Sequence, residues 1–223
     1  MTMGLERPRL IGDLVLDKLR EAIINKELVP GARLSEAGLA ESLQVSKTPV
    51  REALLRLRMI GLVTTADGTL RVVLPSPTLV REAYELRAGL EATTAELACS
   101  RAPADVVEAI AATAGDSLQC AVADDTDGFR RTDRSFHELV AAASGNGLAQ
   151  QQVMNARDLC QALRQRDVMT DHASRVCGEA HVAIAQAIAG HDPVAARSLM
   201  SEHIHYVMDR HLTYMESGEA PAS

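Results

Sequence analysis

The chain has 223 residues, of which 47% are hydrophobic, so it can bury a substantial core and is not a disordered protein. Only 2% of the residues are aromatic and tryptophan is absent, which argues against binding single-stranded nucleic acid by stacking on aromatic side chains. The net charge of −7 is divided unevenly, because residues 1–74 carry +2 and the remainder carries −9. This division predicts a weakly basic N-terminal part and an acidic C-terminal part with different roles.

Cysteine usage and hydropathy indicate a cytoplasmic protein with no membrane partner. No apolar run has the length of a membrane span, and the N-terminus lacks the apolar stretch of a secretory signal. The cysteines form no CxxC pair and are interpreted as reduced, buried thiols. They are Cys99, Cys120, Cys160 and Cys177.

The N-terminal part is predicted to begin with a loose arm, residues 1–10, followed by a helix at about residues 12–26. Arg7 and Arg9 in the arm either contact phosphate groups of a partner or are solvated. Pro30 and Gly31 supply the turn that ends this segment. The helix is predicted from apolar residues with helical spacing. These are Leu14, Leu16, Leu19, Ile23 and Ile24.

Two short helices joined by a tight turn are predicted next. Ser35 is placed to cap the first, which carries Leu39 and Leu43 inward, and Ser46 is placed to cap the second. Pro49 fits in the first turn of the second helix, where a backbone N–H has no intrahelical partner. The second helix has an apolar face with i, i+3, i+4 and i+7 spacing. This face consists of Val50, Ala53, Leu54 and Leu57.

The opposite face of the second helix presents Lys47, Thr48 and Arg51 at its N-terminal end. In a helix-turn-helix, this end of the second helix reaches base edges in the major groove of DNA. Two β-prone runs, residues 62–65 and 70–73, follow on either side of Asp67 and Gly68, and this pattern predicts a hairpin. A hairpin directly after a recognition helix indicates a winged helix, with its tip on the minor groove or the DNA backbone.

These residues closely resemble the winged helix-turn-helix signature of GntR-family bacterial transcriptional regulators, over most of the first 73 residues. The resemblance rests on four segments: Gly31-Ala32-Arg33-Leu34, Leu34-Ser35-Glu36, Val45-Ser46-Lys47-Thr48-Pro49-Val50-Arg51-Glu52-Ala53-Leu54 and Gly61-Leu62-Val63. It implies binding to a double-stranded DNA operator. The implied DNA-binding residues are Arg33, Ser46, Lys47, Thr48, Pro49, Arg51 and Gly68.

The sequence departs from the family pattern at three places. Lys47 stands where arginine is usual, and lysine lacks the bidentate fork that arginine offers to guanine. Asp67 replaces an arginine before the wing glycine, and Ala37 and Gly38 stand where an arginine is common in the preceding helix. Arg51 is therefore the best candidate for specific base readout, and the operator sequence stays open.

A proline-containing linker, residues 75–78, is predicted to be extended and to separate the winged helix-turn-helix, residues 1–74, from an all-helical part, residues 79–216, and a tail, residues 217–223. The chain is thus expected to be mainly α. Prolines, glycines and aspartates divide the helical part into six helices of an antiparallel bundle. The predicted helices are residues 79–101, 104–122, 126–143, 147–168, 172–189 and 192–214.

Four ionisable residues fall on apolar stripes of three of these helices. Asp133 and His137 lie one turn apart, where the two side chains can bind one cation. His181 and His203 lie on the buried stripes of the last two helices. A lone histidine on an apolar face is more often a hydrogen-bonded core residue than a ligand, but four together indicate a site because unpaired polar groups in a core are costly. The other histidines are interpreted as structural or exposed: His172, His191, His205 and His211.

The helical part resembles the FCD effector domain of the FadR-type branch of GntR regulators, over about residues 79–214. The matching segments are Asp133-Arg134-Ser135-Phe136-His137, Ala143-Ser144-Gly145-Asn146, His181-Val182-Ala183-Ile184, Ala195-Ala196, His203-Ile204, Tyr84-Glu85-Leu86-Arg87 and Glu91.

The FCD resemblance implies that Asp133, His137, His181 and His203 bind a divalent metal and that a small carboxylate effector completes its coordination. Imidazole ligands favour Zn²⁺, with Ni²⁺ or Mn²⁺ as alternatives. Arg87 either anchors the effector or pairs with Glu91 at i+4.

The sequence therefore predicts a homodimeric repressor that binds a near-palindromic operator and responds to a small organic acid. Two alternatives stay open. The Asp and three histidines could serve a metal-dependent hydrolase, or the bundle could be only a dimerisation scaffold. The absence of a further general base on the same stripes argues against an enzyme.

Overall fold

The computed structural model describes residues 10–164 and 171–217. The predicted arm with Arg7 and Arg9, the tail beyond Ser217, and the side chain of His172 lie outside the described residues. The chain divides into two compact units, with the boundary between Pro75 and Ser76. Within the described ranges, no helix is long and apolar enough to cross a membrane.

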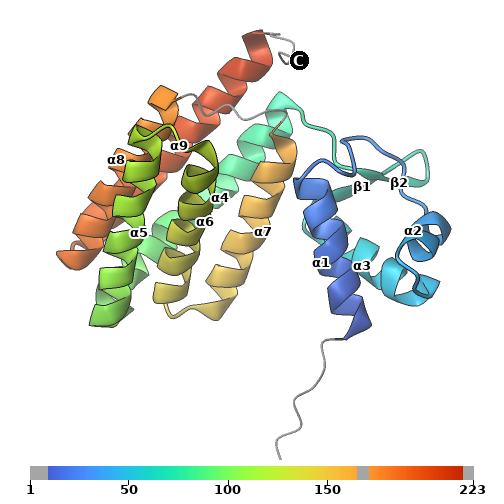
Figure 1. The fold of residues 1–223 in the computed structure, drawn as a ribbon, viewed down its shortest axis with the longest axis horizontal. Helices are drawn as coiled ribbons and strands as arrows, with labels where there is room; N and C mark the ends of the chain where they lie inside the picture. The colour runs from blue at the N-terminus through green and yellow to red at the C-terminus, as the bar shows by residue number, and fades with distance from the viewer. Residues whose placement is uncertain (1–9, 165–170, 218–223) are drawn as a thin grey trace, which may run out of the picture. The chain divides into compact units, whose positions relative to one another are not determined.

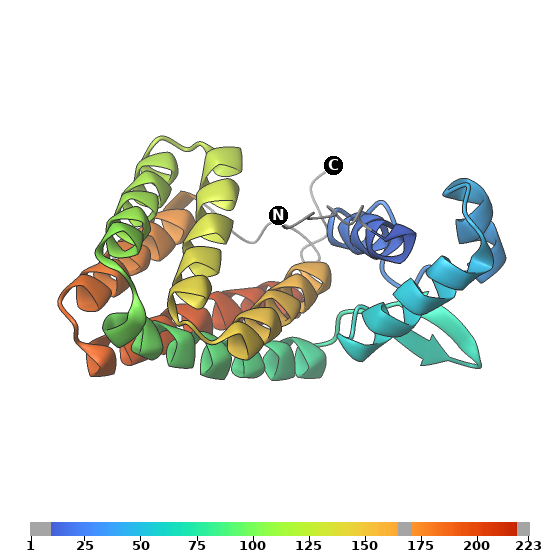
Figure 2. The ribbon, with the colours of Figure 1, turned by 90° about the horizontal axis from the view of Figure 1, so that it is seen from below.

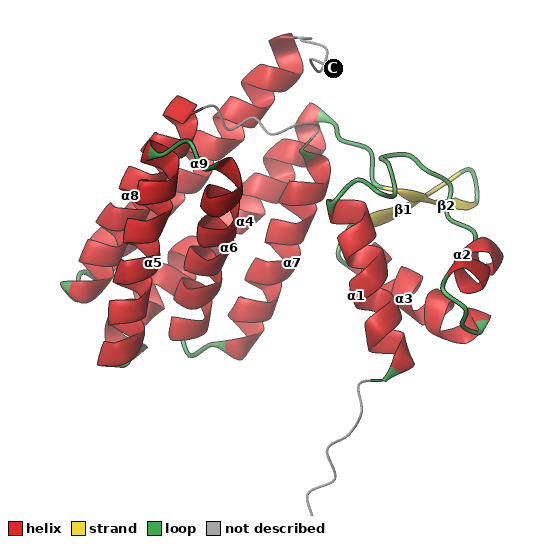
Figure 3. Ribbon diagram, in the orientation of Figure 1, coloured by secondary structure: helices red, strands yellow, loops and turns green. Residues whose placement is uncertain are grey.

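From residue 10 onward, the first unit contains three helices and a two-stranded antiparallel sheet (Figures 1 and 3). Its elements are α1 (Ile11–Ile24), α2 (Glu36–Ser42), α3 (Lys47–Met59), β1 (Val63–Ala66) and β2 (Thr69–Val72). The strands pair from Val63 with Val72 to Ala66 with Thr69. Asp67 and Gly68 between them both have positive φ, 53° and 70°, as a two-residue hairpin turn requires. The predicted winged-helix elements are therefore present.

The core of the first unit lies between α1, α3 and the hairpin. The predicted face of α3 is fully buried, and Val15, Leu16 and Leu19 of α1 pack toward it. Leu14, one of the apolar residues from which this helix was predicted, is 49% exposed, because the buried stripe of α1 is rotated toward Val15. Leu39 and Leu43 of α2 are only half-buried.

The two predicted helix caps differ. Ser35 Oγ accepts a hydrogen bond from Gly38 N at 3.3 Å, as expected for an N-cap. Ser46 occupies the N-cap position of α3, but within the described residues its side chain makes no capping bond. The first turn of α3 therefore keeps backbone N–H groups available to an anionic partner.

The second unit is helical throughout its described residues (Figures 1 and 2). Its helices are α4 (Pro77–Arg101), α5 (Ala104–Val122), α6 (Thr126–Ala143), α7 (Gly147–Leu163), α8 (Asp171–Ala189) and α9 (Pro193–Ser217). The long helices α4 and α9 pack along each other, and α5 packs against both α6 and α8. Helix α4 begins two residues earlier than predicted, because Ser76 caps it and Pro77 is tolerated in the first turn.

The core of the second unit contains the apolar stripes on which the four ionisable residues were found. Phe136 of α6, Ile184 of α8 and Met200 of α9 are completely buried. Helices α5 and α8 approach closely at Gly178, where an added Cβ would lie 2.8 Å from Leu118 Cα. The lack of a side chain at Gly178 therefore permits this close approach. All four cysteines are free thiols, of which Cys120 alone is only half-buried.

Candidate metal centre

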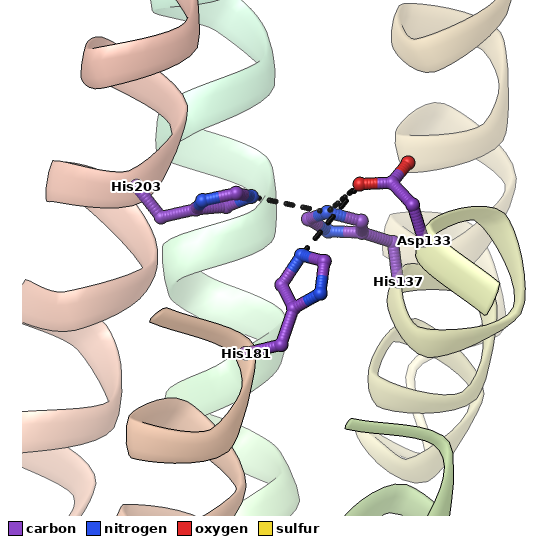
Figure 4. A group of neighbouring side chains, drawn as sticks. All are labelled: Asp133, His137, His181 and His203. Carbon is purple, nitrogen blue, oxygen red and sulfur yellow. Dashed lines mark hydrogen bonds and ion pairs between the residues drawn. The ribbon is translucent and has the colours of Figure 1, made fainter. Parts of the chain in front are cut away.

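Asp133, His137, His181 and His203 converge in the second unit (Figure 4). Helix α6 supplies Asp133 and His137, α8 supplies His181, and α9 supplies His203. Each residue offers one ligand atom, and these four atoms lie within 4.8 Å of one another. The tertiary structure thus brings together the four residues that were selected from separate helical stripes.

The imidazoles face the Asp133 carboxylate and one another. Asp133 Oδ1 lies 3.6 Å from His137 Nε2 and 3.6 Å from His181 Nε2. His203 Nε2 lies 3.3 Å from His137 Nε2. The histidine side chains are at most 4% exposed, whereas Asp133 retains 24% exposure. Asp133 is therefore the most solvent-accessible of the four candidate ligands.

Two further residues hold the imidazoles in place, and the sequence patterns did not identify them as part of the site. The Glu91 carboxylate of α4 bonds to His137 Nδ1, and Ser117 Oγ of α5 lies 3.0 Å from His181 Nδ1. These contacts orient Nε2 of each ring toward the centre, as outer partners of metal-binding histidines do. Glu91 was noted as part of the FCD resemblance and as a possible partner of Arg87, but not as a partner of His137, and a serine within a helix carries no signal.

Two arginines surround the cluster. Arg87 Nε lies 2.5 Å from Glu91 Oε1, so the predicted i+4 pair is formed, and Arg87 Nη2 lies 3.4 Å from His137 Nε2. Arg157 Nη2 lies 3.3 Å from Asp133 Oδ2. Arg157 Nη1 has no hydrogen-bond partner among the described residues, and it lies 3.9 Å from Glu91 Oε1. The centre thus contains an unused guanidinium donor.

The environment sets the protonation states that metal ligands need. Burial lowers the pKa of His181 to about 3 and lowers the pKa of His203 well below its ordinary value. Burial by itself would raise the pKa of Asp133, but His137 and Arg157 outweigh it and hold that pKa well below its usual range. Two of the imidazoles are therefore neutral and the carboxylate ionised at neutral pH, as metal binding requires.

A buried orphan atom tests whether a metal fits this cluster. His181 Nε2 points toward Asp133 and, within the part of the chain that the structure describes, has no hydrogen-bond partner. A buried ring nitrogen without a partner is costly, and a cation at the centre would satisfy it. Three imidazoles and one carboxylate form a donor set that suits Zn²⁺. The residues therefore fit a divalent metal.

The predicted DNA-binding residues lie at the surface of the first unit. Lys47 and Thr48 are exposed in the first turn of α3, and Gly68 is exposed in the hairpin turn. Arg33 is exposed on a segment bridged to β2. The Arg51 side chain is exposed and also forms an ion pair with Glu36 of α2, with Nη2 and Oε2 2.8 Å apart. Ser46 is exposed and Pro49 half-buried beside them.

Residues 12–69 match the bacterial regulatory proteins of the gntR family, and residues 82–206 match the FCD domain. The chain belongs to the GntR family of transcriptional regulators. This membership confirms the recognition made from the two motifs, and it confirms the mainly helical fold with a winged helix-turn-helix.

Relatives of this GntR-family regulator span nearly the same length. It is 32% identical over 196 residues to an uncharacterised HTH-type transcriptional regulator from an unstable DNA locus of Streptomyces ambofaciens, covering 86% of this chain and 81% of the relative. It is 27% identical over 219 residues to the transcriptional repressor NanR of an Enterobacter species, covering 88% and 84%. The fold resembles McbR/YncC of E. coli with a TM-score of 0.75 at 20% identity, covering 95% and 100%.

Family membership distinguishes between the two predicted functions, a transcriptional regulator and a metal-dependent hydrolase. The family and these relatives are transcriptional regulators and not enzymes. The alternative of a hydrolase that uses Asp133 and the three histidines is therefore excluded, and the cluster in the FCD domain is a candidate sensing site.

Proposed function

We propose that this GntR-family regulator is a repressor whose operator affinity is controlled by a small carboxylate bound at a divalent metal. Asp133, His137, His181 and His203 hold the metal, most favourably Zn²⁺, with Ni²⁺ or Mn²⁺ as alternatives. The observation that carries the proposal is the approach of four ligand atoms from three helices to within 4.8 Å. The metal supplies a Lewis-acidic point for the effector carboxylate.

The charge balance of the interior favours an anionic effector. The Asp133 and Glu91 carboxylates offset the guanidinium groups of Arg87 and Arg157, which contact them. A divalent cation held by neutral imidazoles then adds positive charge that no described side chain of this cluster offsets. Because uncompensated charge in a low-dielectric interior is costly, an anion bound at the metal stabilises the occupied centre. Arg87 lies close enough to serve as a second anchor.

The DNA-reading part of the proposal rests on the exposed N-terminal end of α3 and on the family. Paired recognition helices of a homodimer match two half-sites of a near-palindrome, so a change in their spacing alters operator affinity. The effector acts by shifting the packing of the helices that carry the metal ligands. Repression is supported by the NanR relative, whose name describes a transcriptional repressor.

Metal analysis and thermal shift test the sensing half. Full-length protein dialysed against Zn²⁺ should contain one bound ion per chain, and small mono-, di- and tricarboxylates should raise its melting temperature by mass action. His181→Ala should abolish both effects, whereas His205→Ala, at an exposed histidine of α9, should change neither. A protein that binds no metal, with an unchanged melting temperature in Asp133→Ala plus His181→Ala, would support the scaffold alternative instead.

DNA binding by Arg51 is tested separately. Arg51→Ala should weaken binding to a duplex selected from a random library by the wild-type protein far more than binding to unselected duplex. Equal weakening of both would assign Arg51 to phosphate contact alone. Footprinting of the selected duplex should show two protected half-sites, and a single protected half-site would contradict the dimer.

A further inference from the structure

The guanidinium of Arg51 is held by a carboxylate on the preceding helix. Arg51 Nε lies 3.1 Å and 3.0 Å from the two Glu36 carboxylate oxygens, and Arg51 Nη2 lies 2.8 Å from Oε2. Glu36 is the first residue of α2, and Arg51 lies one turn into α3. The pair therefore joins the two helices of the helix-turn-helix at the end that reads DNA.

This pair contributes little to folding. Arg51 is 62% exposed and Glu36 is 31% exposed, and ion pairs at such positions are screened by water. What the contact does fix is the orientation of a long side chain that would otherwise sample many rotamers. Its effect is therefore on the geometry of the guanidinium rather than on stability.

The edge of the Arg51 guanidinium that bonds to Glu36 determines which N–H donors remain available to DNA. Glu36 accepts hydrogen bonds from the side-on edge, which consists of Nε and one N–H of Nη2. The end-on edge, which consists of Nη1 and the second N–H of Nη2, makes no bond to Glu36. This end-on pair of donors matches the O6 and N7 acceptors of guanine in the major groove. The Glu36 carboxylate on the side-on edge therefore fixes the orientation of the guanidinium and leaves its end-on donors available to a base.

We propose that Glu36 is a positioning residue for base readout, which holds Arg51 with its end-on edge available to a guanine. This inference rests on the proposed role of Arg51. It has particular weight in this chain because Lys47, one turn earlier on α3, cannot form a bidentate fork. Arg51 is then the residue at this end of the helix that can provide that mode of readout. Ordering this arginine before binding lowers the entropy lost when it contacts the base.

The test compares two kinds of DNA with the full-length protein. One is a duplex selected from a randomised library by the wild-type protein, and the other is an unselected duplex of equal length. Glu36→Ala, Glu36→Gln, Arg51→Ala and the Glu36→Ala/Arg51→Ala double variant are measured at several salt concentrations. Glu41→Ala is the matched control, because Glu41 is an exposed carboxylate on the same helix.

Glu36→Ala should lower the ratio of specific to non-specific affinity by about three- to tenfold, the effect of ordering one long side chain. Affinity for unselected duplex should stay level or rise, because a negative charge near phosphates is removed. Glu36→Gln, which keeps an acceptor oxygen, should retain more of the ratio than Glu36→Ala. In the Arg51→Ala background, Glu36→Ala should have no further effect on the ratio.

Two results would overturn the proposal. Glu36→Ala could raise affinity for both duplexes equally, as Glu41→Ala is expected to do, which would show that Glu36 acts only as a negative charge. It could also lower the ratio further in the Arg51→Ala background, which would show that it acts independently of Arg51. If Arg51→Ala itself leaves the ratio unchanged, the role proposed for Arg51 fails first, so the two failures are distinguishable.

Discussion

Ser117 Oγ lies 3.0 Å from His181 Nδ1, while His181 Nε2 lies 3.6 Å from Asp133 Oδ1 on the other side of the ring. The three residues belong to α5, α8 and α6, so the two ring nitrogens of one imidazole face residues of two other helices. In the tautomer in which Nδ1–H donates to Ser117 Oγ, Nε2 is left with a lone pair directed at the cluster. The geometry of the candidate metal centre therefore involves a serine that is not one of its four candidate ligands.

Ser117→Ala should lower Zn²⁺ affinity by about 10- to 100-fold, the usual effect of losing an outer hydrogen bond to a metal-binding histidine. Competition with a chromogenic chelator measures this affinity. Thr113→Val is the matched control on α5, because its hydroxyl donates a hydrogen bond to Ala109 O of its own helix at 2.8 Å. An affinity as high in Ser117→Ala as in Thr113→Val would contradict the positioning role.

The metal-free protein should lose stability as the pH falls from 7 toward 5. Burial lowers the pKa of His181 to about 3 and that of His203 well below its ordinary value, whereas both titrate near 6.5 when unfolded. Between those pKa values the unfolded chain binds more protons, so acid favours unfolding, by up to about 1.4 kcal/mol per pH unit for each imidazole. Urea denaturation at a series of pH values measures this slope. His181→Gln should flatten it, and a wild-type free energy of unfolding that is independent of pH would refute the prediction.

Glu91→Gln should destabilise the metal-free protein by about 3–5 kcal/mol, because it leaves the Arg87 guanidinium buried without a charged partner. The two side chains are only 4% and 1% exposed. Glu138→Gln is the matched control, since Glu138 pairs with Arg134 at the same i+4 spacing but at 40% and 58% exposure. It should cost less than about 1 kcal/mol. Urea denaturation compares the two, and similar small losses would show that the buried pair is not critical.

Gly178→Ala should destabilise the protein by about 1–3 kcal/mol, because its Cβ would meet Leu118 backbone at 2.8 Å and push α5 away from α8. Gly115→Ala on α5 should instead gain about 0.5–1 kcal/mol from helix propensity. Its Cβ would meet no described atom within 4 Å. Thermal denaturation measures the change in stability of both variants. A stabilised Gly178→Ala variant would show that the helix crossing tolerates a wider spacing.

The sequence by itself determined the features that depend on local spacing. Helical periodicity located α3 and the stripes of α6, α8 and α9, and Asp67 with Gly68 located the hairpin. It also placed the four candidate metal ligands on buried faces, because an apolar stripe with 3.6-residue spacing identifies the inward side of each helix. The DNA-reading and effector-domain motifs could likewise be identified from residues that are close together in the sequence.

Tertiary structure alone decided which inward side chains meet. The contacts of Ser117 with His181 and of Glu91 with His137 join residues 64 and 46 positions apart, and the pairing of Glu36 with Arg51 spans 15. Periodicity along one helix fixes neither the rotation of its neighbour nor the depth at which two helices cross. For that reason the residues that orient each candidate ligand could not be predicted from the sequence patterns. The same holds for α1, where Val15 is buried and Leu14 is exposed.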